Sequence, residues 1–267
     1  MKILFIGDIS GENARKAVGM RCPQLRKELN IDLVIANIEN AAHGRGATLK
    51  IVEELRGYGI NVMTSGNHIW RQKGYEEFLC NSQYKVIRPI NYPEDIVGMG
   101  FVEIDTNAGR ALVINVLGFD FIVNVERTVI EPFRYMKKFL GSIELEDYEA
   151  IFVDFHAEVT AEKKAFGLYF DGLVSAIVGT HTHVQTADEE ILPKGTAYIT
   201  DVGMVGPKDS ILWTKKNIIF DRMMYPYGQM FDISEDKNVL FNAVVVETDG
   251  YNKAKSIERI NEVVVVG

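Results

Sequence analysis

Short apolar runs alternate with polar segments along most of this chain. Runs of roughly four to eight apolar residues bounded by glycine or other turn residues are typical of buried strands. The clearest of these runs are residues 3–6, 32–38, 61–65, 150–155 and 173–177. Apolar positions at helical spacing follow three of the runs, over about 13–29, 48–56 and 160–170. This alternation predicts an α/β protein in which helices connect parallel strands.

Other segments add antiparallel strands to this pattern. Two apolar runs on either side of a short polar turn predict a hairpin in the middle of the chain, and two more at its end are joined around Asp249-Gly250. Residues 119–125 fit either a strand or a loop. The remaining expected elements are hairpin strands at 101–104 and 111–116, helices at 75–80 and 131–140, an extended piece at 85–89, strands at 196–200, 239–247 and 256–266, and a glycine-containing loop at 201–207.

Composition narrows the class of protein. A chain of 267 residues that is 47% hydrophobic can bury one large core, so we expect a single domain over residues 1–267. Its net charge of −8 argues against binding long nucleic acid, which normally needs a basic face. No run of 18 apolar residues and no signal-peptide pattern is present, which predicts a cytoplasmic protein without a membrane segment. Cys22 and Cys80 are too few for a disulfide framework, and we expect both thiols to be buried.

Polar residues follow five of the predicted strands, at the point where each strand ends. The carboxyl ends of parallel strands line one crevice of an α/β sheet, so side chains far apart in sequence are expected to meet there. The alternative is a mixture of helix caps, turn residues and a core histidine; Asp8, for example, fits either a ligand or a helix cap. The set consists of Asp8, Glu39 with Asn40, Asn67 with His68, His156, and His181 with His183.

These residue types are suited to binding a metal ion. Carboxylate oxygen, amide oxygen and imidazole nitrogen, without thiolate, suit iron, manganese, zinc or nickel better than magnesium or calcium. The donors are numerous enough for two ions. A small anionic substrate is compatible with the acidic chain, because bound cations reverse the local sign of the charge.

Six motifs resemble those of the calcineurin-like metallophosphoesterases, and within them the YmdB-like branch of bacterial phosphodiesterases. The resemblance runs nearly end to end and implies a four-layer αββα sandwich with two mixed β-sheets. The motifs are Gly7-Asp8-Ile9-Ser10-Gly11, Glu39-Asn40-Ala41-Ala42-His43-Gly44, Gly66-Asn67-His68, Asp154-Phe155-His156-Ala157-Glu158, Gly179-Thr180-His181-Thr182-His183-Val184-Gln185-Thr186-Ala187-Asp188 and Ile199-Thr200-Asp201-Val202-Gly203-Met204.

The same resemblance implies a binuclear site in which Glu39 bridges two ions, most simply iron or manganese, with zinc or nickel as alternatives. The wider superfamily has Asp-x-His in its first motif, whereas this chain has Ser10 at the histidine position, and Asn40 is expected to supply the missing donor. One ion would be held by Asp8, Glu39, Asn40 and His183, and the other by Glu39, Asn67, His156 and His181.

The implied reaction is phosphodiester hydrolysis, in which a metal-bridging hydroxide attacks phosphorus and His68 protonates the leaving alkoxide. The alternative role for His68 is to orient a metal ligand. His43 and Arg45 are expected either to contact a substrate phosphate or to be solvated loop residues. By resemblance the substrate is a small cyclic nucleotide, especially a 2′,3′-cyclic nucleotide monophosphate.

Several assignments stay open at this point. Four carboxylates have two possible roles. They either orient the imidazoles of metal ligands or stabilise helix ends and turns, and they are Asp154, Glu158, Asp188 and Asp201. The aromatic runs 119–121 and 225–227 either stack on a nucleobase or belong to the core. The chain could instead be a regulatory interaction protein with a vestigial metal site, or a phosphomonoesterase, and the sequence leaves homo-oligomerisation open.

Overall fold

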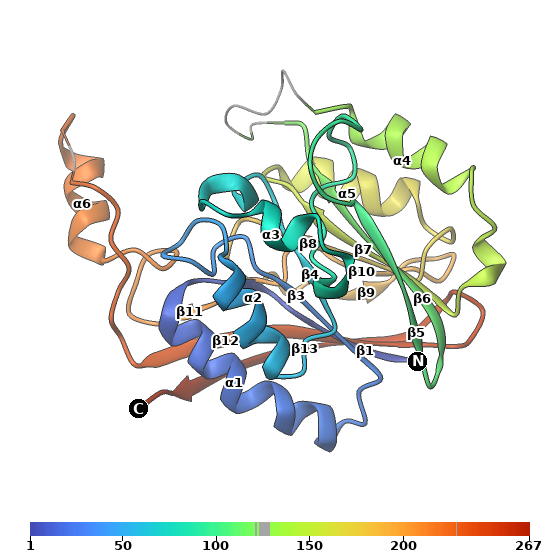
Figure 1. Ribbon diagram of the computed structural model, residues 1–267, viewed down its shortest axis with the longest axis horizontal. Coiled ribbons are helices and arrows are strands. Elements are labelled where there is room, and N and C mark those ends of the chain that lie inside the picture. Colours follow the sequence, from blue (N-terminus) through green and yellow to red (C-terminus); the bar gives the residue numbers. More distant parts are fainter. Residues whose placement is uncertain (121, 123–128, 228) are drawn as a thin grey trace.

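Two mixed β-sheets pack face to face in the computed structural model, with helices on the outside of each (Figure 1). The structure describes residues 1–120, 122, 129–227 and 229–267. The expected four-layer αββα sandwich is confirmed. Within the described residues, no helix is both long and apolar enough to cross a bilayer.

The first sheet contains seven strands in the described part of the chain. Their order is β2-β11-β12-β1-β3-β4, and β13 pairs with β12. β1 runs parallel to β3 and antiparallel to β12, so the sheet is mixed. The strands are β1 (Lys2–Ile6), β2 (Asp8–Ile9), β3 (Leu33–Asn37), β4 (Val62–Thr64), β11 (Met204–Pro207), β12 (Asn238–Thr248) and β13 (Ala254–Val265).

The second sheet has six strands among the described residues, in the order β5-β6-β7-β8-β10-β9. Its four central strands are parallel, and an antiparallel strand pairs at each edge. The strands are β5 (Phe101–Thr106), β6 (Gly109–Leu117), β7 (Ala150–His156), β8 (Ala176–Thr180), β9 (Glu190–Ile191) and β10 (Ala197–Ile199).

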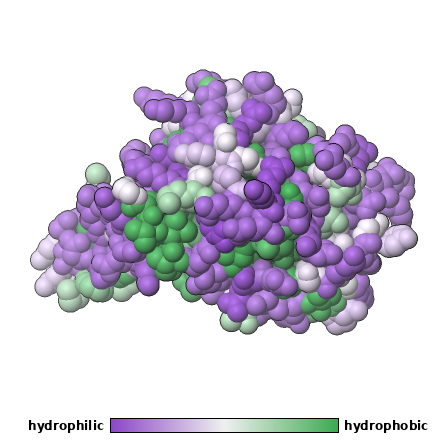
Figure 2. All heavy atoms as spheres, turned by 90° about the horizontal axis from the view of Figure 1, so that it is seen from below, coloured by the Kyte–Doolittle hydropathy of each residue, from purple (hydrophilic) through white to green (hydrophobic). Residues whose placement is uncertain are grey.

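Helices cover the outer face of each sheet. Val18 and Leu55 from the first two helices pack in one cluster with Val34 of β3, while Met136 and Phe166 belong to the cluster on the second sheet. The surface on the α1 side is mostly hydrophilic, with hydrophobic residues in separate clusters (Figure 2). The helices are α1 (Gly11–Glu28), α2 (Leu49–Gly57), α3 (Glu76–Leu79), α4 (Pro132–Leu140), α5 (Thr160–Tyr169) and α6 (Lys216–Met224).

The core between the sheets is built by alternate residues of the central strands. Phe5 of β1 stacks on Phe152 of β7, with ring centroids 5.4 Å apart. Its neighbours Leu4 and Ile6 face the other way, into the cluster beneath the helices. Both faces of these strands are therefore buried, which explains why they are continuous apolar runs rather than alternating ones.

The structure corrects several expectations. Residues 204–207, expected in a loop, form β11, and the strand expected at 173–177 lies at Ala176–Thr180. Cys22 is buried as expected, but Cys80 is exposed. Asp8 does not cap α1, because it lies in β2 and the N-cap position is Ser10.

Two further outcomes concern segments that the sequence left unclear. Helix α6 was not predicted, because its apolar residues show no helical stripe facing the core, and only Ile218 among them is buried. Residues 119–125 were expected to form either a strand or a loop. Of these, residues 121 and 123–125 lie outside the described residues.

Candidate metal centre

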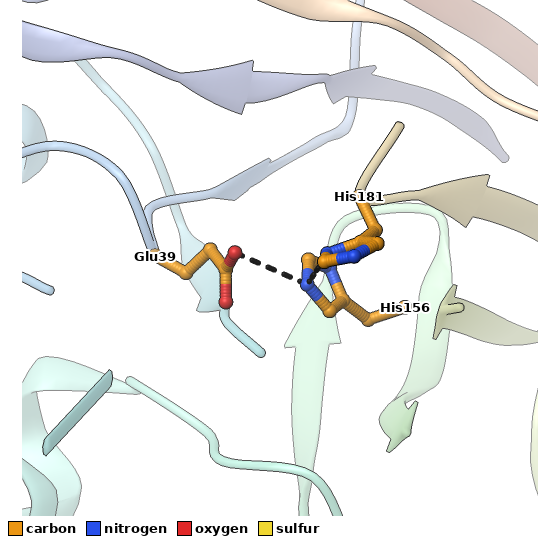
Figure 3. A group of neighbouring side chains, drawn as sticks. All are labelled: Glu39, His156 and His181. Carbon is orange, nitrogen blue, oxygen red and sulfur yellow. Dashed lines mark hydrogen bonds and ion pairs between the residues drawn. The ribbon is translucent and has the colours of Figure 1, made fainter. Parts of the chain in front are cut away.

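Strand ends from both sheets meet at the centre of the molecule. The first sheet supplies Asp8 from β2 and residues two or three positions beyond the ends of β3 and β4, while His156 ends β7 and two histidines follow β8. Glu39 faces His156 and His181 across the gap between the sheets (Figure 3). The expected convergence therefore occurs, but at the junction of two sheets rather than along the edge of one.

The tightest group of donor atoms consists of Glu39, His156 and His181. Glu39 Oε1 lies 3.1 Å from His156 Nε2, which lies 3.0 Å from His181 Nδ1. One ligand atom from each residue lies within 4.8 Å of the others. Such a set of carboxylate and imidazole donors is suited to a transition-metal ion.

Asp8 and His183 form a second group beside the first. The Asp8 side chain is fully buried, and its Oδ1 lies 3.9 Å from His183 Nε2. The backbone N–H of His181 donates to Asp8 Oδ2 at 3.2 Å, which connects the two groups. Burial raises the pKa of Asp8 well above its usual value. A cation beside this carboxylate would offset that burial cost, because opposite charge favours the ionised form.

Buried polar atoms without a hydrogen-bond partner supply the test of whether metal fits here. Among the described residues they include Asp8 Oδ1, Asn40 Oδ1 and Asn67 Oδ1. Asn40 Nδ2 donates to the Gly44 carbonyl at 2.9 Å, so only its oxygen is left without a partner. Each unpaired buried acceptor costs about 1–3 kcal/mol. These oxygens come from three strand ends of the first sheet, and bound cations would supply the partners that they lack.

Two of the three histidines are in the neutral state that metal binding requires, and the third shares a proton with Glu39. Burial lowers the pKa of His181 to about 3 and that of His183 to about 4, so both are neutral at pH 7. Burial also disfavours protonation of His156, but the charge of Glu39 outweighs it and raises the pKa of His156 to about 9. In turn, His156 outweighs the effect of burial on Glu39 and lowers the pKa of that carboxyl. This pair therefore holds a proton that a bound cation would displace.

Thr180 and Asp154 orient His156. The Thr180 hydroxyl donates to Asp154 Oδ1 at 2.7 Å and lies 2.8 Å from His156 Nδ1. Because the hydroxyl hydrogen is used on Asp154, its oxygen accepts the Nδ1 proton and leaves Nε2 facing Glu39. Asn37 Nδ2 of β3 donates to the other oxygen of Asp154 at 3.0 Å, so this carboxylate also links the two sheets.

The remaining three candidate orienting carboxylates differ in what they contact. Glu158 Oε2 lies 3.0 Å from His181 Nε2, on the far side of the ring from the site. Asp201 accepts hydrogen bonds from the backbone of the histidine loop at Thr182, 3.1 Å away. Asp188 instead accepts from Thr186 and the backbone N–H of Thr200, so it supports a turn rather than an imidazole.

Lys163 holds the histidine loop, and the sequence offered no reason to single it out. Its ammonium is buried and donates to the Thr180 carbonyl at 2.7 Å and to Asp201 Oδ2 at 2.6 Å. The loop needs such support because His181 and His183 have φ angles of 96° and 65°, which are unfavourable for residues with a side chain. The lysine and Asp201 thus restrain the backbone that presents both imidazoles.

Residues 4–260 match the model of a family described as YmdB-like protein. The chain belongs to the YmdB-like family. It is 42% identical over 260 residues to a Bacillus subtilis (strain 168) protein named 2′,3′-cyclic-nucleotide 2′-phosphodiesterase, covering 97% of this chain and 96% of the relative. The predicted membership of the calcineurin-like metallophosphoesterases is confirmed, and the chain is a phosphoesterase.

Two solved structures share this fold closely with the YmdB-like chain. One is described as a novel phosphatase from Mycoplasma pneumoniae, with a TM-score of 0.91, 34% identity, and coverage of 98% of this chain and 93% of the other. The second is a hypothetical protein from Thermus thermophilus, with a TM-score of 0.90, 35% identity, and coverage of 98% and 99%.

Gly66 allows the two sheets of this YmdB-like protein to meet. A Cβ atom at this position would lie 2.2 Å from Glu39 Oε2 and 2.4 Å from His156 Nε2. These distances are far below van der Waals contact, so only glycine fits there without moving a candidate ligand. The sequence had marked Gly66 as part of a motif, but without this steric reason.

His68 lies at the mouth of the site. Its backbone N–H donates to Glu39 Oε2 at 3.2 Å, and its Nδ1 lies 3.6 Å from Glu39 Oε1. The side chain is 25% exposed, so it contacts both the buried carboxylate and the entrance. Burial lowers the pKa of His68 from its usual value. The position suits a residue that contacts substrate, and it also suits one that orients Glu39.

Residues His43 and Arg45 are exposed on the loop that follows Glu39 and Asn40. Arg45 lies over the ring of Phe231, with its Cζ 5.8 Å from the ring centroid. This contact joins the loop to Phe231, in a segment where the sequence had suggested a substrate contact only for the aromatic run 225–227. The one available signal was an interleaving of aromatic and basic residues over 213–231.

The two aromatic runs considered for base stacking have separate outcomes. Tyr225 and Tyr227 are exposed rather than core residues, and they stack on each other at 5.7 Å. In the other run, Phe121 lies outside the described residues, so that prediction stays open.

Proposed function

We propose that this YmdB-like protein is a binuclear, metal-dependent phosphodiesterase that hydrolyses cyclic nucleotides, with 2′,3′-cyclic nucleotide monophosphates as the preferred class. The observation that carries the proposal is the set of buried oxygens without hydrogen-bond partners at the strand ends of the first sheet, opposite the strand ends that carry His156, His181 and His183. The substrate class rests on the name of the Bacillus subtilis relative.

The family motifs divide the residues that would hold two ions into two sets. Asp8, Asn40 and His183 would serve one ion and Asn67, His156 and His181 the other, with Glu39 shared. When bound, such ions lower the pKa of coordinated water and neutralise phosphate charge. Iron and manganese are the first choices, because nitrogen and oxygen donors without thiolate accommodate both.

The chain's own residues would position the substrate and transfer a proton. His68, partly exposed beside Glu39, would donate a proton to the leaving alkoxide. Arg45 and His43 stand on an adjacent loop, where a guanidinium could hold a phosphate oxygen by paired hydrogen bonds. Thr180 and Glu158 would keep two imidazoles oriented through the reaction.

The test combines metal analysis with a substrate panel. Protein purified without chelators is analysed for bound metal, then assayed on bis-p-nitrophenyl phosphate and on 2′,3′- and 3′,5′-cyclic nucleotides with and without added manganese. We expect metal-dependent hydrolysis and a preference for the 2′,3′-cyclic substrates. Absence of hydrolysis with every metal, together with a specific protein partner, would favour a regulatory interaction protein instead.

Two variants separate metal binding from proton transfer. Glu39→Ala should lose both bound metal and turnover, because the shared carboxylate is removed. His68→Ala should keep the metal but lose turnover by roughly 10²–10⁴-fold, the usual contribution of a general acid. Metal-dependent hydrolysis retained by Glu39→Ala would defeat the bridging role, and unchanged kcat in His68→Ala would leave that histidine an orienting role only.

Phosphomonoesterase activity is the second candidate, because a solved structure 34% identical to this chain is described as a phosphatase. Rates on a phosphomonoester and its matching diester, measured at one metal concentration, distinguish the two. A higher kcat/KM for the monoester would replace the phosphodiesterase proposal.

A further inference from the structure

We propose that the segment around α6 binds the nucleotide preceding a cyclic phosphate at the 3′ end of a short single-stranded RNA. This inference rests on the proposed function, since it extends the same site from a mononucleotide to an RNA end. The segment, called here the α6 arm, comprises the described residues 211–227 and 229–233. It stands at one side of the molecule, where α6 projects away from the two sheets (Figure 1).

One end of the α6 arm packs directly on the loop that contains the candidate metal ligands. The indole of Trp213 lies against Gly44, where an added Cβ would come within 2.8 Å of the ring. The carbonyl of Gly44 in turn accepts the hydrogen bond from Asn40 Nδ2 at 2.9 Å. The α6 arm is therefore linked to a candidate ligand through one residue.

Two guanidinium groups at this end have no acidic partner among the described residues. Arg45 and Arg222 both lie over the ring of Phe231, with Cζ atoms 5.8 Å and 4.4 Å from its centroid. Neither forms an ion pair with a carboxylate in the part of the chain that the structure describes, and Arg222 Nη1 donates a hydrogen bond only to the Gln229 carbonyl, at 3.0 Å. By contrast, Lys215 and Lys216 on the same α6 arm are paired with Asp232 and Asp209.

Two arginines left without carboxylates are informative in an acidic chain. The protein carries a net charge of −8, so carboxylates are plentiful. Arg45 is on the loop proposed to hold the phosphate of the substrate, so Arg222 on the α6 arm is the group suited to a second phosphate. In an RNA strand that second phosphate is the diester linking the terminal nucleotide to the one before it.

Exposed aromatic rings continue along the α6 arm. Phe231 is 43% exposed, and Tyr225 and Tyr227 are 48% and 75% exposed. The two tyrosines, with Asp221 and Gln229, line a hollow of about 330 Å³. Aromatic rings combined with arginines are how proteins bind single-stranded nucleic acid without reading its sequence. Only a short strand is expected, because the acidic body offers no broad basic face.

A second copy of this chain is the competing occupant of the α6 arm. Met223, Met224 and Met230 are also highly exposed, and methionine-rich surfaces are common at protein contacts. The RNA end is favoured because two guanidinium groups without a carboxylate partner among the described residues lie at the end of the α6 arm that meets the metal-site loop. An interface between copies would need no such position.

The experiment compares kcat/KM for a 2′,3′-cyclic nucleotide with kcat/KM for a trinucleotide ending in the same cyclic phosphate. We expect the trinucleotide to be preferred by roughly tenfold or more, the range that one stacked base supplies. Hydrolysis of the mononucleotide with no preference for the trinucleotide would overturn the inference and leave the proposed function intact.

Variants on the α6 arm make the test specific. Arg222→Met and Phe231→Leu should bring the preference ratio down toward one. Arg56→Met is the matched control, because Arg56 of α2 lies over Tyr84 in the same kind of contact, with Cζ 5.3 Å from the ring centroid, and the ratio should not change. Variants that change the sedimentation behaviour but not the ratio would assign the α6 arm to self-association and overturn the inference.

A binding measurement keeps the two proposals separable. Fluorescence anisotropy with a labelled trinucleotide 3′-phosphate reports on the α6 arm even if no substrate is hydrolysed. Weaker binding to Arg222→Met than to Arg56→Met would support the RNA-end site in either case. Equal binding to both variants would overturn it, whereas absence of hydrolysis with every metal counts against the proposed function alone.

Discussion

The two sheets supply different kinds of donor to the candidate metal centre. Oxygens come from the first sheet, at Asp8, Glu39 and the asparagines beyond β3 and β4, whereas the imidazoles of His156 and His181 come from the second. The imidazoles are held by close polar contacts with Thr180 and Glu158, while several of the oxygens have no partner among the described residues. One sheet is thus already organised, and the other is left with acceptors that a cation would satisfy.

The chemistry of the side chains explains this difference. An imidazole has two nitrogens, so one can bind Thr180 or Glu158 while the other faces the site. The amide of Asn40 is anchored through its nitrogen, and its oxygen then has no protein donor available among the described residues. The imidazoles of the second sheet and the oxygens of the first are therefore positioned by different contacts. Substitutions can disturb one set of donors without the other.

Substitution at the boundary between the sheets should have the largest effect. In Gly66→Ala the new Cβ must displace Glu39 or His156, so we expect turnover to fall by about 10³-fold, the scale of losing a positioned electrostatic group. The measurement is kcat on a cyclic nucleotide, with bound metal determined on the same preparation.

Gly57→Ala is the matched control, because nothing lies within 4 Å of a Cβ at that position at the end of α2. It should keep full turnover. Equal activity of the Gly66→Ala and control variants would contradict the close approach of the two sheets.

Removing the buried support of the histidine loop should mainly affect stability. Lys163→Met leaves the Asp201 carboxylate buried without its cation, which typically costs about 3–5 kcal/mol in the free energy of unfolding. Urea denaturation monitored by circular dichroism measures this loss.

Lys164→Met provides the comparison, since the neighbouring Lys164 forms its ion pair with Glu190 at the surface, where such pairs contribute little. A Lys163→Met protein as stable as the Lys164→Met protein would show that the histidine loop does not depend on this buried pair.

Removing bound metal with a chelator should lower the free energy of unfolding by less than the Lys163→Met substitution does. The effect is expected mostly on the first sheet, which carries the oxygens without partners. A cation at 100 times its dissociation constant stabilises the folded state by about 2.7 kcal/mol. For a chain of this size that corresponds to a fall in Tm of roughly 5–10 °C when metal is removed.

Thermal unfolding with and without a chelator measures this shift, and added manganese should reverse it. Asn67→Ala, which lacks one of the unpaired oxygens, should show a smaller shift than the parent protein. A chelator that leaves Tm unchanged would argue against metal at these oxygens.

The smallest effect concerns the helices that cover the first sheet. Burial raises the pKa of the Cys22 thiol on α1 to about 11, so its reactive thiolate is scarcely populated at pH 8. Cys80, after α3, is exposed. Alkylation followed by mass spectrometry should modify one thiol in the folded protein and two after unfolding, with no loss of turnover after the first. Rapid modification of Cys22 would mean that this helical layer opens.

Local pattern was enough to predict most of the strands and the residue types at their ends. Apolar runs such as 3–6, 32–38 and 150–155 are buried on both faces, and a polar residue directly after such a run is conspicuous. That is why Asp8, Glu39 and His156 could be selected as site residues from the sequence alone, and why the family motifs were recognisable. Their roles as ligands stay a prediction that the metal analysis will test.

Only the tertiary structure decided how these residues meet. The division of donors between two sheets follows from strand order, which sequence periodicity does not encode. The steric role of Gly66, the burial of Lys163 and the contact of Arg45 with Phe231 all depend on segments brought together from distant parts of the chain. Helical and strand periodicity describe how one segment faces its surroundings, whereas a distance between two segments exists only once the core has packed.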